Sequence, residues 1–121
     1  SLTLTDINGA DATSVFQNDE NANLNVSGSL LPIGTLNASA VSNSVSYIGT
    51  NNQTIKPATY YNLTIVNSGE KSVSSDITVN NNLTLEYGTT LSIGTNVKVK
   101  VLGRTITSGA LINNGQLILS D

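Results

Sequence analysis

The chain has 121 residues and a formal net charge of −3, and charged residues make up only 11% of it, well below the roughly 25% of ordinary globular domains. Cys and His are absent, which excludes a disulfide framework, a thiolate nucleophile, a Cys-rich zinc site and a His general base. Five cations against eight acidic residues exclude a basic nucleic-acid-binding surface. We therefore predict a protein that is not an enzyme and that carries no cofactor and no metal.

Short segments that alternate apolar and polar residues follow one another along the chain, which is the pattern of half-buried strands. In chain order these predicted strands are residues 2–5, 24–26, 45–48, 63–66, 77–79, 83–85, 91–93, 97–101 and 117–119. Clusters of Gly and Asn separate them, and both residue types suit turns because they tolerate positive φ. No segment has helical periodicity, and none approaches the roughly 18 apolar residues of a membrane-spanning helix.

The spacing of similar segments indicates a repeat. Residues 62–65 recur as residues 82–85, 20 positions later, and residues 77–79 recur as residues 97–99 at the same interval. A longer similarity joins residues 28–35 to residues 88–95, with five of eight positions identical. A period near 20 residues with several strands in each period is typical of a solenoid.

We therefore predict an all-β fold, a single-domain parallel β-helix (β-solenoid) with about 20 residues per coil, over residues 1–121. About six coils at the 4.8 Å spacing of paired strands would form a column about 29 Å tall. Residues 10–23 are the least strand-like part, and residues 1–23 are interpreted as a cap or loop region. The alternative fold is an antiparallel β-sandwich, which also needs many short strands but not equal offsets between them.

Strand alternation then assigns each side chain to the interior or the surface. The predicted inward side chains are Leu63, Ile65, Ile77, Val79, Leu83, Leu85, Val97 and Val99. The predicted outward side chains are Thr64, Thr78, Thr84 and Lys98. Asn side chains at corners are expected to stack into amide ladders, and Pro32 and Pro57 are expected at corners or edges, where no strand donor is needed.

Three phrases of the sequence resemble the repeats of large exported surface proteins of Bacteroidetes, of the flavobacterial type. They lie at residues 60–65, 76–85 and 110–117, and residues 23–40 look like a more diverged unit. The resemblance implies a right-handed parallel β-helix similar to filamentous-haemagglutinin and autotransporter passengers. It also implies secretion, by the type IX route, to an extracellular location on the bacterial cell surface, with a role in adhesion or as a surface scaffold.

Some parallel β-helices cleave polysaccharides, and paired carboxylates on one face would indicate such an activity. The 20-residue period places Lys56, Asp76 and Asn96 in register, which we interpret as a surface ion pair rather than a catalytic pair. Asp19 and Glu20 are adjacent, so in a strand they would face opposite ways. These scattered carboxylates do not form a catalytic pattern.

Three further patterns have ordinary structural interpretations. The segment from Asp6 to Asp11 has oxygen-bearing residues around a Gly, like the start of a calcium loop, but it lacks the later bidentate Glu. A Thr array of the kind that binds ice would be interrupted here by charged residues on the outer faces. Five Asn-x-Ser/Thr sequons begin at Asn25, Asn37, Asn52, Asn62 and Asn82, as an Asn-, Ser- and Thr-rich composition produces without selection for glycosylation.

The predicted function is structural and adhesive: a stiff polar β-helical surface presented to cell-surface glycans or proteins. The predicted ligand-binding residues are Tyr60, Tyr61, Thr64 and Thr84, because exposed Tyr stacks on sugars and outward Thr offers hydroxyl groups. One alternative is a self-assembling fibre subunit, a homo-oligomer stacked end to end through the terminal strands. Its predicted assembly residues are Leu2, Leu4, Leu117 and Leu119. A second alternative is a carbohydrate-binding or polysaccharide-cleaving β-helix module.

Overall fold

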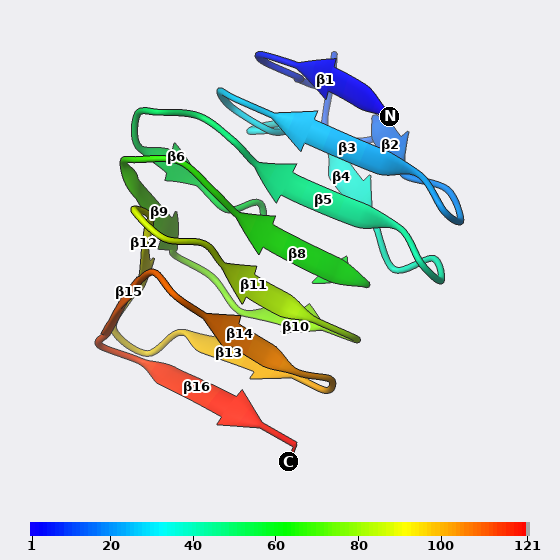
Figure 1. The fold of residues 1–121 in the computed structure, drawn as a ribbon. Coiled ribbons are helices and arrows are strands. Elements are labelled where there is room, and N and C mark those ends of the chain that lie inside the picture. Colours follow the sequence, from blue (N-terminus) through cyan, green and yellow to red (C-terminus); the bar gives the residue numbers. More distant parts are fainter. Residues whose placement is uncertain (121) are drawn as a thin grey trace.

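The computed structural model describes residues 1–120, and all the regular structure in that range is β-strand (Figure 1). The sixteen strands are β1 (Leu2–Leu4), β2 (Val15–Gln17), β3 (Asn23–Val26), β4 (Thr35–Asn37), β5 (Ser44–Tyr47), β6 (Gln53–Thr54), β7 (Thr59–Tyr60), β8 (Asn62–Ile65), β9 (Glu70–Val73), β10 (Ile77–Val79), β11 (Leu83–Leu85), β12 (Thr90–Ile93), β13 (Lys98–Val101), β14 (Thr105–Thr107), β15 (Ala110–Asn113) and β16 (Gln116–Leu119). No described residue belongs to a helix that could cross a membrane.

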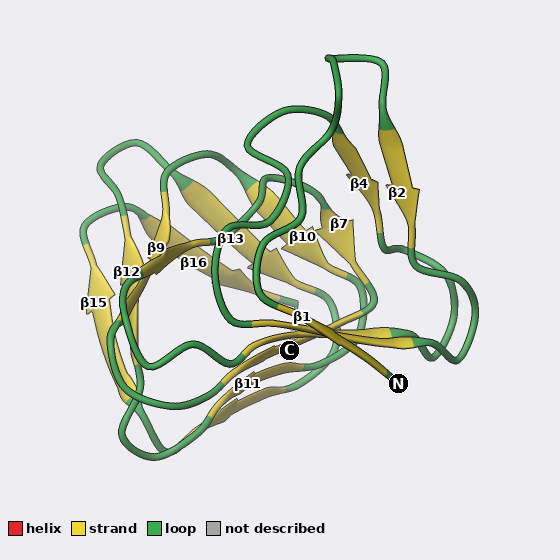
Figure 2. Ribbon diagram, turned by 90° about the horizontal axis from the view of Figure 1, so that it is seen from above, coloured by secondary structure: helices red, strands yellow, loops and turns green. Residues whose placement is uncertain are grey.

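The strands form three walls of a column, seen end-on in Figure 2. The six-stranded sheet has the order β1-β3-β5-β8-β11-β14 and runs the whole length of the column. The second wall, the β6–β15 sheet, has the order β15-β12-β9-β6. The third wall, the β7–β16 sheet, has the order β16-β13-β10-β7, and a separate pair, β2-β4, lies to one side of it in Figure 2.

The chain therefore winds through six coils. Coils 3 to 6 contribute three strands each (β5–β7, β8–β10, β11–β13 and β14–β16), whereas coils 1 and 2 contribute two strands each (β1–β2 and β3–β4). Every strand pair is parallel, as the predicted β-solenoid requires. The fold prediction is confirmed, and the antiparallel sandwich is wrong. The handedness implied by the resemblance stays a prediction.

Residues 1–23 contain two strands that belong to the column. β1 pairs with β3 at the top of the six-stranded sheet, and β2 pairs with β4. The segment therefore makes up the first coil, and the turn at residues 10–14 is its irregular part.

The coil length varies around 20 residues. Paired residues are 18 apart for Val45 and Leu63, 20 apart for Leu63 and Leu83, and 22 apart for Leu83 and Thr105. The repeat at residues 62–65 and 82–85 thus corresponds to a real pairing.

The second predicted repeat is wrong in register. Ile77 pairs with Val99, 22 residues later, and not with Val97. The turn between β12 and β13 is longer than the turn between β9 and β10, and it contains Asn96 at a φ of 62°. A slip of two residues keeps every side chain on its own face, so the alternation in the sequence could not reveal it.

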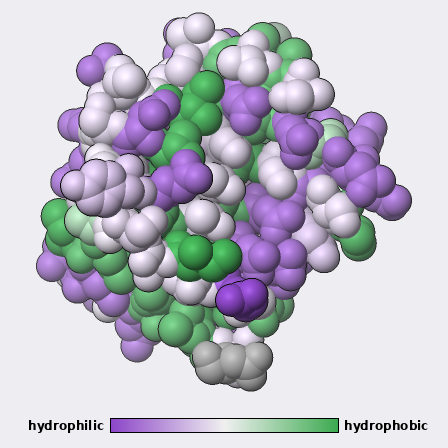
Figure 3. All heavy atoms as spheres, in the orientation of Figure 1, coloured by the Kyte–Doolittle hydropathy of each residue, from purple (hydrophilic) through white to green (hydrophobic). Residues whose placement is uncertain are grey.

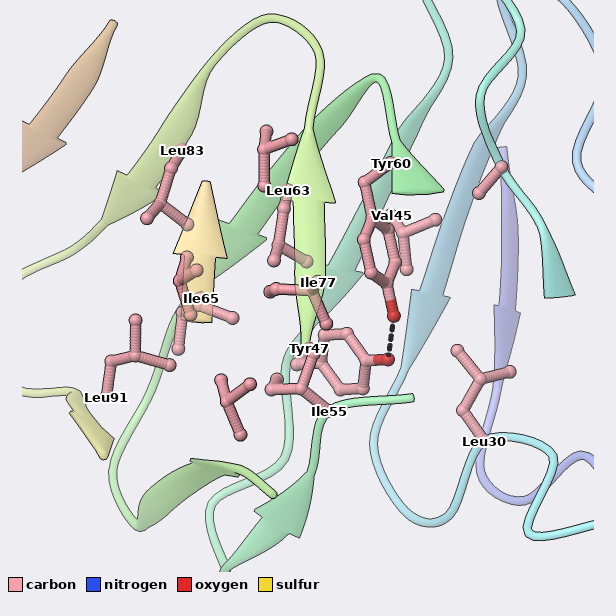
Figure 4. Packing of buried hydrophobic residues seen from close by; sticks show 14 of the residues in the cluster. Leu30, Val45, Tyr47, Ile55, Tyr60, Leu63, Ile65, Ile77, Leu83 and Leu91 are labelled. Atoms are coloured by element: carbon pink, nitrogen blue, oxygen red, sulfur yellow. Dashed lines mark hydrogen bonds between the residues drawn. The ribbon is translucent and has the colours of Figure 1, made fainter. Parts of the chain in front are cut away.

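The interior of the column is a continuous aliphatic stack. All eight predicted inward side chains are buried, with at most 6% of their surface exposed. The outward assignment also holds, because Thr64, Thr78 and Thr84 are half-buried and Lys98 is exposed. Tyr47 and Tyr60, both from coil 3, are the largest fully buried side chains, and they lie between Leu63 and Ile77 of coil 4 on one side and Leu30 of coil 2 on the other (Figure 4).

The Asn residues at the corners form a ladder only in part. Asn81 Nδ2 donates to Asn62 Oδ1 at 2.9 Å, which is one rung between amide side chains. Asn43 Nδ2 instead donates to the backbone oxygen of Asn18, and Asn82 Oδ1 accepts from the backbone of Arg104. Most corner amides therefore satisfy backbone groups, which turns leave without strand partners.

Candidate functional site

The predicted ligand-binding residues do not lie together on one surface. Tyr60 has none of its surface exposed, so it is removed from the set of residues that could contact a ligand. It points inward because alternation in β7 turns it toward the core, and its neighbour Tyr61 is half-buried at the corner before β8. Thr64 and Thr84 pair directly on the six-stranded sheet and face outward.

These two Thr side chains belong to a longer polar row. Parallel pairing brings Thr3, Asn25, Ser46, Thr64 and Thr84 into one line across five strands, each outward and none charged. Asn25 Nδ2 donates to Thr3 Oγ1 at 3.3 Å, so part of the row is already hydrogen-bonded. On this face, polar and apolar areas are mixed, and the apolar areas gather toward the lower part, where the last coils lie (Figure 3). We call these five residues the polar row.

The predicted assembly residues lie in the first and last coils. Leu2 and Leu119 are 46% and 50% exposed, and Leu4 and Leu117 are half-buried. Their counterparts one coil inward, such as Leu24 below Leu2, are buried.

The predicted register of Lys56, Asp76 and Asn96 is wrong. Thr78 pairs with Thr59 and with Lys100, which shifts Asp76 away from both predicted neighbours. The carboxylate of Asp76 instead accepts a hydrogen bond from the backbone N–H of Lys98 at 2.8 Å. This carboxylate therefore satisfies a turn between strands.

The oxygen atoms of the Asp6–Asp11 segment are also directed at backbone groups. Asp6 Oδ1 accepts from the N–H of Ser29 at 2.7 Å, and Asp11 Oδ1 accepts from both the N–H and the hydroxyl of Thr13. The hydrogen bond from the Thr13 side chain lowers the pKa of Asp11. Within residues 1–120 no three Asp or Glu side chains gather at a position suited to a metal ion.

A hollow lies where the second wall of the column is interrupted. It has a volume of about 520 Å³ and lies between residues 28–32 of coil 2 and residues 52–57 of coil 3. We call it the coil 2–3 groove. Both prolines of the chain, Pro32 and Pro57, line it, so the prediction that they lie outside the strand ladder is confirmed.

Two side chains cross the space between coils 2 and 3. Gln53 Nε2 donates to the carbonyl oxygens of Val26 and Gly28 at 3.0 and 2.8 Å, and its Oε1 accepts from the N–H of Gly49. Lys56 Nζ donates to the carbonyl oxygen of Gly34 at 2.7 Å. The Lys56 ammonium thus bonds to a backbone oxygen and not to a carboxylate, and it is half-buried.

A buried Tyr pair fixes the backbone at Lys56. The Lys56 N–H donates to the Tyr47 hydroxyl at 2.9 Å, and the Tyr60 hydroxyl donates to the Lys56 carbonyl. The two hydroxyl groups are 2.8 Å apart, and since the Tyr60 proton is already used, Tyr47 is the donor between them (Figure 4). Burial raises the pKa of Tyr47 to about 12 and raises the pKa of Tyr60 well above 10.

A second unusual cation lies inside the column. Lys71 has no exposed surface, and its Nζ donates to the carbonyl oxygens of Gly49 and Ser68, each at 2.6 Å. Burial lowers its pKa. Alternation in the sequence places Lys71 on the inner face of β9. Backbone carbonyl oxygens stabilise its ammonium group there, and the composition of the chain does not show that such acceptors are present.

Tyr87 is an exposed aromatic residue that the predicted ligand-binding set did not include. Its side chain is 89% exposed. The next residue, Gly88, is also open to solvent, because a Cβ added there would have no atom beyond its chain neighbours within 4 Å. The signal was the turn pair Tyr87-Gly88 after the short strand β11, because a turn projects its side chains outward.

Comparison with protein-family models, with curated proteins and with solved structures finds no match to this chain.

Proposed function

We propose that this chain is a structural and adhesive segment of an exported bacterial cell-surface protein. Its parallel coils form a stiff rod, and its outer surface binds cell-surface glycans or proteins through many weak hydrogen bonds. Low charge supports this role, since the surface can approach neutral polymers without desolvating many ions.

The observation that carries the proposal is the polar row. Five uncharged polar side chains lie in line on neighbouring strands, at the roughly 4.8 Å spacing that strand pairing sets. Such a row offers a repeating set of hydroxyl and amide groups to a repeating polymer. Rigid strands hold the groups in place, so binding costs little conformational entropy.

Calorimetry with soluble neutral polysaccharides (dextran, mannan and xylan) tests the proposal. We expect a binding heat that the double variant Thr64→Lys/Thr84→Lys abolishes, because two ammonium groups would interrupt the middle of the row. Thr78→Lys is the matched control, since Thr78 also faces outward from a central strand but on the β7–β16 sheet. Equal loss in the control, or no heat with any polysaccharide, would contradict glycan binding by the row.

Tyr61→Ala extends the same experiment to the carbohydrate-module alternative. A loss of heat in this variant alone would favour a local sugar site at the corner before β8 over an extended row. Tyr87→Ala serves as its comparison, because Tyr87 is more exposed and lies at a different corner.

A second candidate function is end-to-end assembly into a surface fibre. The observation in its favour is the exposed apolar surface of the last coil, where Leu111 and Leu119 are 38% and 50% exposed while Leu91 and Val101, their partners in coil 5, are buried. Stacking coil 6 of one copy on coil 1 of the next would continue the parallel ladder. Negative-stain electron microscopy over a concentration series should then show filaments that Leu119→Lys disperses, and short separate particles at all concentrations would contradict it.

A further inference from the structure

The coil 2–3 groove lies at a break in hydrogen bonding between strands. Within residues 1–120, β6 pairs with β9 and with no other strand, so its edge toward coil 2 has no strand partner there. Above the groove, coils 1 and 2 are joined by the bridge between Ile7 and Leu30 and by further backbone hydrogen bonds, such as that from the Gly9 N–H to the Ile33 oxygen, so the missing pairing lies between coils 2 and 3. An unpaired strand edge presents backbone N–H and C=O groups at the spacing of another peptide strand.

The gap does not close by collapse of the two coils. Gln53 and Lys56 reach across it to backbone oxygens of coil 2, so on this wall the two coils are joined by side chains and not by strand pairing. Pro32 and Pro57 lack the N–H that would be needed for the two segments to pair with each other. The Tyr47–Tyr60 pair fixes Lys56 from below, so the groove is built on buried contacts.

The lining of the groove suits a peptide strand with a carboxylate. Leu30 and Leu31 form an apolar floor, each almost fully buried, which accommodates alternate side chains of an extended segment. Lys56 is the one charged residue of the lining, and its ammonium bonds only to a neutral carbonyl oxygen. A carboxylate is a stronger acceptor for an ammonium group than a carbonyl is.

We propose that the coil 2–3 groove binds an extended acidic peptide segment of a partner protein, which adds as a strand to the free edge of β6 and places a carboxylate on Lys56. This inference rests on the proposed function, because it names one class of protein partner for the adhesive surface. It uses a different face of the column from the polar row, so the two are separable by experiment.

The test is selection from a phage-displayed library of random peptides on the folded wild-type chain. We expect enriched peptides to contain Asp or Glu within a segment that lacks proline, because proline cannot complete the strand pairing. A synthetic copy of an enriched peptide, followed by fluorescence anisotropy, should bind Lys56→Gln about tenfold or more weakly than wild type, since a charge-assisted hydrogen bond is lost. Lys98→Gln, an exposed Lys on another wall, should bind as wild type does.

Amide chemical-shift changes should be confined to residues 28–32 and 52–57. No enrichment over the Lys56→Gln chain, peptides without acidic residues, or equal weakening by Lys98→Gln would overturn the proposal. So would displacement of the peptide by polygalacturonate at lower concentration than the peptide itself needs, because the groove would then be an acidic-glycan site. The Thr64→Lys/Thr84→Lys variant should keep full peptide affinity, so failure of the polar row and failure of the groove give different results.

Discussion

Coils 3 to 6 differ from coils 1 and 2 in how they are held together. The later coils contribute a strand to each of three walls, and backbone hydrogen bonds join every coil to the next. The first two coils lack a strand in the second wall, and side chains such as Gln53 and Lys56 bridge the interval to coil 3. The column can therefore lose backbone pairing between two coils on one wall and still keep its continuous stack of buried side chains. The lost pairing leaves a groove.

The similarity of residues 28–35 to residues 88–95 makes this difference sharper. In coil 5, Leu91 and Ile93 lie in β12 and point into the core. In coil 2, Leu31 has a φ of 47° and lies outside any strand, next to Pro32 where coil 5 has Ser92. Proline removes a strand donor at this position, so nearly the same apolar pattern gives a strand in one coil and an irregular turn in the other.

The largest expected difference between the two regions lies in their cores. Leu63→Ala should lower the free energy of unfolding by about 3–4 kcal/mol, because Leu63 is fully buried between Val45 and Leu83. Leu36→Ala should cost about 2 kcal/mol, at the lower end for a buried Leu, since its strand has one partner, β2, and the irregular coil can relax around the cavity. Urea denaturation of both variants measures the two values. Equal losses would mean that coils 1 and 2 are packed as tightly as the later ones.

The Tyr pair at the boundary between the regions should make stability sensitive to alkaline pH. The raised pKa of Tyr47 keeps its proton on the folded chain, while the unfolded chain loses it near pH 10. The stabilising contribution is complete below pH 10 and is lost as the pH rises to about 12, a difference of about 3 kcal/mol for a two-unit shift. Denaturation across this range should show the loss in wild type and a smaller loss in Tyr47→Phe.

Tyr61→Phe is the control for this experiment, because Tyr61 is half-buried and lies outside the pair. At pH 7, Tyr47→Phe should cost about 1–2 kcal/mol, since the Lys56 N–H loses its acceptor. An unchanged alkaline loss in Tyr47→Phe would mean that Tyr47 does not hold its proton in the folded chain.

Much of the fold could be predicted from the sequence because period-2 alternation determines which side chains face inward. It placed Ile77, Val79, Val97 and Val99 in the core correctly even though the pairing of these strands was assigned two residues out of register. Alternation is blind to a shift of two residues, and only the length of each turn decides it.

The site was much less predictable. The sequence does not show which of the adjacent residues Tyr60 and Tyr61 points inward. Only the strand register shows that Tyr60 is buried. The coil 2–3 groove depends on a missing strand, and nothing in a local pattern shows that two segments about 25 residues apart fail to pair. Pro32 and Pro57 were the available signal, because they mark positions where the ladder has no donor.

The bridge across the groove gives an effect of intermediate size. Gln53→Ala should cost about 2 kcal/mol, because the N–H of Gly49 and two carbonyl oxygens lose their partner. Thr54→Ala is the matched control in the same strand, since its side chain is exposed, and it should change stability by less than about 0.5 kcal/mol. Thermal unfolding measures both, and a negligible change in Gln53→Ala would mean that coils 2 and 3 are held together without this side chain.

The smallest expected effect concerns Tyr87, at a corner of the regular region. Tyr87→Ser should change the free energy of unfolding by less than about 0.5 kcal/mol, because the ring is 89% exposed. Tyr60→Phe, which removes one hydroxyl from the buried pair, should cost more, even though it changes far fewer atoms. Denaturant midpoints of the two variants compare an exposed ring with a buried hydroxyl on one scaffold. A larger loss of unfolding free energy for Tyr87→Ser would show that the ring packs on the corner in solution. Tyr87 would then not be available to contact partners.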